Sequence, residues 1–144
     1  MSITSTTTGR ADRETGQAHS AGKNRTLWAA QVLLAAVFAF AAMPKLAGAH
    51  SAVAMFGQIG AGQWLRYLVG TAELAGAAGL LIPRLAGLAA AGLAADMAGA
   101  SIINIAVLHS AAVALTIPLC AALALLARAR WEHTTKFLAA RTTR

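Results

Sequence analysis

The stretch LVGTAELAGAAGLLIP, residues 68–83, is almost entirely apolar and small, with one carboxylate, Glu73, near its middle. Apolar runs of about 18 or more residues are typical of transmembrane helices. Four such runs occur in the chain, at about 27–46, 64–82, 85–107 and 110–127. The whole chain is 58% hydrophobic and only 12% charged, whereas about a quarter of the residues of a soluble domain are charged. The sequence therefore predicts an all-α membrane protein with a bundle of four transmembrane helices.

The segments around these runs define the expected domain organisation. Residues 1–25 are rich in Ser, Thr, Gly and charge, which predicts a disordered tail. The transmembrane domain is expected over residues 26–128, followed by a basic tail over residues 129–144. In the first loop, AGAHSAVAMFGQIGAGQ, apolar residues recur with helical spacing, which predicts a short interfacial helix. Pro83 and Arg84 predict a tight turn, so that the second and third spans form an antiparallel hairpin.

The distribution of basic residues predicts the orientation. Ten of the 12 Lys and Arg residues fall on the side of both termini, and only Lys45 and Arg66 fall on the other. Because cytoplasmic loops carry the excess of Lys and Arg, both termini are expected in the cytoplasm. The formal charge of +7 thus indicates topology in a lipid bilayer, and we expect no nucleic-acid partner. Lys45 ends the first span, where its side chain is expected to reach the outer membrane surface.

Two acids are predicted near the middle of the membrane. Glu73 precedes Pro83 by 10 residues, and Asp96 follows Arg84 by 12. At 1.5 Å per residue both lie roughly 15–18 Å from this turn, near the centre of a core about 30 Å thick. A charge at this depth costs about 2.5–3.5 kcal/mol, so such groups face the bundle interior and are functional candidates.

The direction of the side chains leaves two arrangements open. Helical side chains lean toward the N-terminus, so Glu73 leans toward Arg66 and Asp96 leans toward the cytoplasm. The two acids either face each other or miss each other and share a water molecule or a ligand. In a purely structural alternative, each acid is protonated and hydrogen-bonded to a neighbouring backbone group or hydroxyl, such as Thr71, Ser101 or Thr116. We assign Glu73 and Asp96 as candidate catalytic residues, with candidate ligand-binding roles for Arg66, Lys45 and Asn104.

No other pattern in the sequence indicates catalytic chemistry. His50 and His109 both fall in outer loops, but two histidines alone make a poor metal site, so no metal is expected. Cys120 is the single cysteine, which excludes an internal disulfide. A phosphate loop, a nucleophile elbow and nucleic-acid motifs are absent from the sequence. Whether the chain is an enzyme is left open.

From about residue 27 to 127 the chain resembles the DoxX-like family of small bacterial four-helix membrane proteins. The resemblance rests on KLAGAHSAVAMFGQIG, LRYLVGTAELAGAAGLLIPRLAGLAA, MAGASIINI and the proline of TIPLC. It implies a multi-pass protein of the bacterial cytoplasmic membrane. The wider family is named for a subunit of a quinone-linked thiosulfate oxidoreductase, so the resemblance implies quinone as a candidate cofactor. Relatives often carry His near Asn104, where this chain departs from the pattern.

Three classes of function remain. The resemblance favours a membrane subunit of a quinone-linked oxidoreductase or redox-stress complex, in which Glu73 and Asp96 bind the ligand or carry its proton. The second class is a small proton-coupled transporter that uses the same acids. The third is a non-catalytic structural or assembly subunit. A homo-oligomer or a redox-complex partner is expected in addition to the lipid bilayer.

Overall fold

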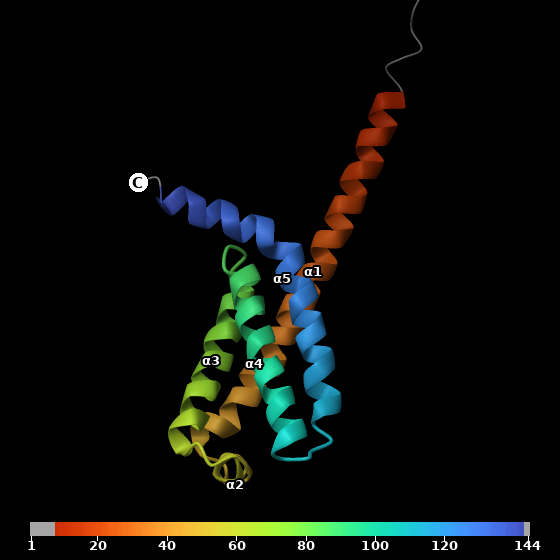
Figure 1. Ribbon diagram of the computed structural model, residues 1–144. Coiled ribbons are helices and arrows are strands. Elements are labelled where there is room, and N and C mark those ends of the chain that lie inside the picture. Colours follow the sequence, from red (N-terminus) through yellow and green to blue (C-terminus); the bar gives the residue numbers. More distant parts are fainter. Residues whose placement is uncertain (1–7, 143–144) are drawn as a thin grey trace, which may run out of the picture. The chain divides into compact units, whose positions relative to one another are not determined.

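The computed structural model describes residues 8–142, and this part of the chain is helical apart from short connections, with no strand (Figure 1). The described helices are α1 (Thr8–Ala47), α2 (His50–Ile59), α3 (Gln63–Leu81), α4 (Ala86–Ala106) and α5 (Val113–Thr142). The chain divides into two units, Met1–Ala30 and Gln31–Arg144. All residues around the candidate site lie in the second unit, which includes the last turns of α1. The all-α prediction is confirmed.

The helices include stretches that are suited to a lipid bilayer. Among the described residues, three stretches are long and apolar enough to cross a membrane: Asn24–Ala47, Ala86–Ala106 and Val113–Glu132. Large apolar side chains on their surfaces are exposed, and Phe40 and Leu125 reach 84% and 68%. The second predicted span, at 64–82, corresponds to α3, which is not among the three stretches. These features fit a protein that crosses the membrane several times.

The predicted domain boundaries fall inside helices. The tail expected over residues 1–25 overlaps the beginning of α1, and the tail expected over residues 129–144 overlaps the end of α5. The disordered state of the first tail and the domain limits at 26–128 stay predictions. Residues 1–7 and 143–144 lie outside the described residues.

Helices α3 and α4 form the hairpin that the sequence predicts. The amides of Leu85 and Ala86 both donate to the carbonyl of Ile82 at 2.9 Å, which closes the turn between the two helices. A Cβ atom added at Gly79 would lie only 2.8 Å from the Cβ atom of Ala89. Small residues let helix backbones approach closely in a membrane, and this contact sets the spacing of the hairpin. On its other side, α4 packs along α5.

The first loop contains the short helix α2, as predicted. Its buried residues, Ala52 and Phe56, are one turn apart and therefore share one face. The helix ends at Gly60, whose φ of 77° lies in the left-handed region that favours glycine. Gln63 Nε2 donates to the carbonyl of Val53 at 3.1 Å, which ties α2 to the beginning of α3.

Candidate functional site

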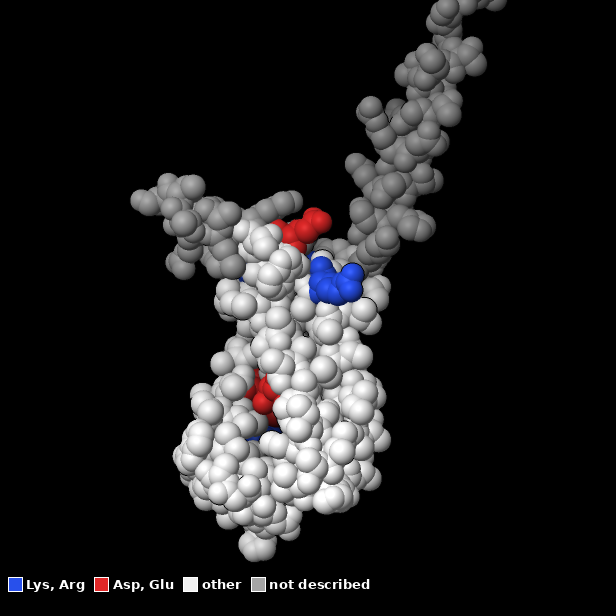
Figure 2. Space-filling view, in the orientation of Figure 1, with Lys and Arg blue, Asp and Glu red and all other residues white. Residues whose placement is uncertain are grey.

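A cavity of about 500 Å³ lies inside the bundle, between parts of all five helices. Its wall is mostly apolar. Figure 2 shows a hollow in the lower part of the visible face, with acidic and basic atoms inside it and uncharged residues around it. The polar or charged side chains of the wall are Lys45, Glu73, Asp96, Asn104 and Thr116. An apolar cavity with a few polar groups is typical of sites that bind small molecules.

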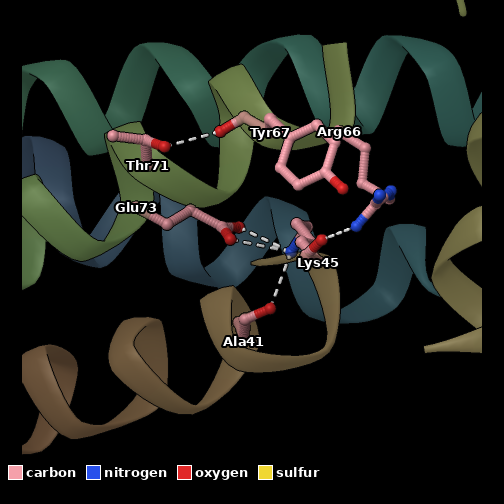
Figure 3. A network of polar contacts seen from close by, with 6 residues as sticks. All are labelled: Ala41, Lys45, Arg66, Tyr67, Thr71 and Glu73. Atoms are coloured by element: carbon pink, nitrogen blue, oxygen red, sulfur yellow. Dashed lines mark hydrogen bonds and ion pairs between the residues drawn. The ribbon is translucent and has the colours of Figure 1, made fainter. Parts of the chain in front are cut away.

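Lys45 and Glu73 form an ion pair at this wall (Figure 3). Lys45 Nζ donates to Glu73 Oε1 at 2.9 Å and to Oε2 at 2.8 Å, and it also donates to the carbonyl of Ala41 at 3.1 Å. The Glu73 side chain is 2% exposed and that of Lys45 is 15% exposed. The expectation that Lys45 reaches the outer membrane surface is therefore wrong, because its ammonium group turns inward to the buried carboxylate.

A close approach of α1 to α3 makes this ion pair possible. Gly70 lies about one turn before Glu73, and a Cβ atom added there would come within 3.0 Å of Lys45 Cβ and 3.1 Å of Leu46. Glycine at this position lets the C-terminal turns of α1 rest against α3. The ammonium group of Lys45 is thereby held at the level of Glu73.

Arg66 does not bind Glu73, although the sequence places the two on one face of α3. Its NH1 atom donates to the carbonyl of Lys45, and Nε donates to Gln63 Oε1 at 2.9 Å. Its guanidinium carbon lies 4.1 Å from the centre of the Tyr67 ring, a cation–π distance. Arg66 is buried but is not among the residues that line the cavity. These contacts anchor the end of α1 to α3, and the ligand-binding role of Arg66 stays a prediction.

Asp96 lines the same cavity from α4. Its Oδ2 atom is buried and has no hydrogen-bond partner among the described residues. No hydrogen bond or ion pair between Glu73 and Asp96 is found in this part of the chain, so the two acids share one cavity without direct contact. A buried carboxylate oxygen without a donor is costly, and in native proteins such a group calls for an explanation such as an ordered water molecule, an ion or a catalytic role.

The hydroxyl groups named as alternative partners of the acids bind elsewhere. Ser101 Oγ donates to Thr116 Oγ1 at 2.8 Å, which links α4 to α5. Thr71 Oγ1 donates to the carbonyl of Tyr67 at 2.7 Å. Asn104 is 8% exposed and lines the cavity, as its candidate ligand-binding role requires.

Gln31, a buried amide 14 residues before Lys45 on α1, was not among the predicted site residues. Gln31 is fully buried, its Nε2 donates to the carbonyl of Leu80 at 2.6 Å, and its Oε1 accepts from Arg130 Nε at 2.9 Å. One amide thus joins α1, α3 and α5 within the second unit. A lone Gln in the apolar run WAAQVLLAAVF was the available signal, because buried polar groups inside membrane spans are expensive and are bonded to neighbouring helices.

The described residues contain no group of three or more His, Cys, Asp or Glu side chains that could hold a metal ion. Cys120 Sγ donates to the carbonyl of Ala94 at 3.3 Å, in the contact between α5 and α4. This hydrogen bond gives Cys120 a packing role. The absence of a metal cofactor stays a prediction.

Comparison with known proteins agrees with this architecture. The sequence model of the DoxX-like family matches residues 29–139, a range that contains every residue of the cavity wall. No curated protein and no solved structure matches the chain. With its apolar helices and a family match over most of its length, the chain is a multi-pass membrane protein of the DoxX-like family.

Proposed function

We propose that the chain is a membrane subunit of a quinone-linked oxidoreductase or redox-stress complex, with Glu73 and Asp96 as its ligand or proton site. The observation that carries this proposal is the apolar cavity of about 500 Å³ with two acids in its wall. Its volume lies within the range of roughly 300–1,000 Å³ that is usual for small-molecule sites. Ionisable groups inside a membrane domain are functional candidates by default.

The donor set at the cavity fits a quinone head group. All three N–H donors of Lys45 are engaged, two by Glu73 and one by Ala41. The Oδ2 atom of Asp96 has no hydrogen-bond partner among the described residues. As an acid it can donate a hydrogen bond to a ring carbonyl, and as a carboxylate it can accept one from a ring hydroxyl. A bound quinone supplies a carrier for electrons and protons, and a partner subunit supplies the electrons.

The proposal includes four membrane spans, with α3 as the second of them in chain order. The 19 residues of α3 are long enough to cross the hydrocarbon core. Its charged residues Arg66 and Glu73 are 3% and 2% exposed, so they face the protein, whereas Leu68 and Leu74 are exposed. The surface that α3 presents to lipid is therefore more apolar than its average composition.

The orientation follows from the same basic residues as in the sequence analysis. With both termini in the cytoplasm of a bacterium, the turn between α3 and α4 faces the cytoplasm and α2 lies at the outer interface. The interfacial position of α2 is supported by its buried residues Ala52 and Phe56, with polar Ser51 and Gln58 exposed. A homo-oligomer or a redox partner completes the proposed assembly.

Quinone binding tests the proposal directly. The purified protein is titrated with a decyl-substituted benzoquinone in detergent, and binding is followed by tryptophan fluorescence. Gly99→Leu should weaken binding at least about tenfold, because Gly99 lines the cavity and an added Cβ there meets no heavy atom within 4 Å. The larger side chain fills the cavity without a clash at Cβ. The matched control is Ala98→Leu, at the neighbouring exposed position, which should bind normally.

Other outcomes favour the other function classes. Proton flux into liposomes that depends on Glu73 and Asp96, without any quinone binding, would support a proton-coupled transporter. Unchanged assembly with partner proteins after both acids are replaced, again without quinone binding, would support a structural subunit. Either result would overturn the quinone-linked proposal.

A further inference from the structure

A second space adjoins the cavity at Asp96. It is a groove of about 300 Å³ between α3 and α4, and its wall includes Asp96 as well as small and aliphatic residues of both helices. Ala72, Ala75, Leu88 and Gly92 in this wall are exposed. Because these helices face lipid, the groove opens toward the bilayer. Asp96 lines both spaces and is the residue that their walls share.

The groove is long and has no polar side chain apart from Asp96. On the α4 side the wall extends from Leu85, the residue directly before α4, to Asp96, a separation of 11 residues or about 16 Å along the helix axis. At its floor the helices touch, since a Cβ atom added at Gly76 would lie 2.6 Å from the Leu93 side chain. At Gly92, by contrast, an added Cβ atom meets no heavy atom within 4 Å. Gly92 thus borders the open part of the groove.

The side chains that line the groove favour one kind of ligand. Leucine and alanine side chains offer apolar contact along the groove, and burying methylene groups against them is favourable. The groove offers no donor or acceptor to a polar group except at Asp96, where the buried Oδ2 atom has no hydrogen-bond partner. A molecule that matches both features has one polar head and a hydrocarbon tail.

We propose that the ligand of the cavity is a lipid-borne molecule whose polar head binds at Asp96 and whose hydrocarbon tail lies in the groove between α3 and α4. This inference rests on the proposed function, because it concerns the ligand of the same cavity. The ligand reaches the cavity sideways from the bilayer and leaves by the same path. Asp96 contacts the head, whereas Glu73 is held by Lys45 and positions the wall around it.

Two benzoquinones that differ only in the tail separate head binding from tail binding. The decyl-substituted compound and the same ring without the chain are titrated into wild-type protein and into Gly92→Leu, Gly99→Leu and Asp96→Asn. Gly92→Leu should weaken binding of the decyl compound at least about tenfold, because two buried methylene groups are already worth that much. Its affinity for the compound without a tail should change less than about threefold. Gly99→Leu and Asp96→Asn should weaken binding of both compounds.

The outcomes distinguish this inference from the proposed function. If Gly92→Leu affects both compounds equally, or affects neither, while Gly99→Leu still blocks binding, the tail is not in the groove but the cavity still binds the head. If the wild-type protein binds neither compound, the proposed function fails. Ala98→Leu serves again as the control outside both spaces. Thermal unfolding of Gly92→Leu in detergent should match that of wild type, since its added Cβ meets no neighbour.

Discussion

The ion pair between Lys45 and Glu73 makes a sharp prediction about stability. From the sequence alone, Glu73→Gln is a mild change, because it keeps the shape of the side chain and removes a buried charge. In the structure, Glu73 is 2% exposed and both of its carboxylate oxygens bind Lys45 Nζ, at 2.8 and 2.9 Å. The substitution therefore leaves an ammonium group without its counter-charge inside the bundle.

Removing one partner of a buried ion pair typically costs about 3–5 kcal/mol. We expect Glu73→Gln and Lys45→Met each to lower the free energy of unfolding by about 3 kcal/mol, the lower end, because Lys45 remains 15% exposed. The double variant removes both charges at once, and replacing a buried ion pair by groups of similar volume is often nearly neutral. It should therefore lie within about 1 kcal/mol of wild type, which corresponds to a coupling energy of about 5 kcal/mol.

Unfolding by SDS titration from detergent micelles, followed by circular dichroism, measures these differences. Arg128→Met is the matched control, because Arg128 is an exposed cation and surface substitutions usually stay within about 0.5 kcal/mol. Additive losses in the double variant, or an unchanged Glu73→Gln, would refute the ion pair. Ligand binding is also best measured in the double variant, because it lacks the acid of Glu73 but is expected to keep the stability of wild type.

Two further predictions concern packing and topology. Gly79→Ala should lower the free energy of unfolding by about 1–3 kcal/mol, because its Cβ atom would meet Ala89 Cβ at 2.8 Å and overpacking costs about this much. In the control Gly92→Ala, the added Cβ atom has no neighbour within 4 Å, so this variant should not be destabilised. Equal losses of stability of the two variants in SDS titration would contradict the close contact at Gly79. Single cysteines introduced at positions 20, 57 and 140 test the orientation. A reagent added outside the cell should label only position 57. Labelling of position 57 only from the cytoplasmic side would show that the orientation is reversed.

The positions of the central helices could be predicted because apolar runs mark them directly. The runs expected at 64–82 and 85–107 agree with α3 and α4 to within about one residue at each end. The run expected from residue 110 begins later, at Val113, because His109 adopts a positive φ of 46° and the chain turns through Ser110. Hydropathy does not mark where α1 begins or where α5 ends, since α1 starts in polar sequence at Thr8 and α5 continues into polar sequence up to Thr142.

The pairing of the site residues could be predicted only in part. Depth along each helix follows from residue counts, and both acids indeed line one cavity. The partner of Glu73 depends on how α1 is rotated about its axis and on how closely it approaches α3. The spacing of residues along one helix gives neither the rotation nor the distance. Gly70 permits that approach, while Gln63, Tyr67 and the carbonyl of Lys45 hold the Arg66 side chain. Spacing along one helix therefore suggested the wrong cation.

The two charged residues Arg66 and Glu73 lower the mean hydropathy of α3, and Glu73 is also a residue of the candidate site. α3 carries Arg66 and Glu73 and is not among the three stretches that are apolar enough to cross a membrane, yet both side chains are buried inside the protein. A mean over the helix counts them as if they faced lipid, whereas their cost is offset by Lys45 and by the bonds that Arg66 makes. A span in contact with protein on one face can carry such charges, and it has a reason to do so when they border a cavity. The helix that hydropathy leaves out of the candidate spans thus carries one of the two acids of our site proposal.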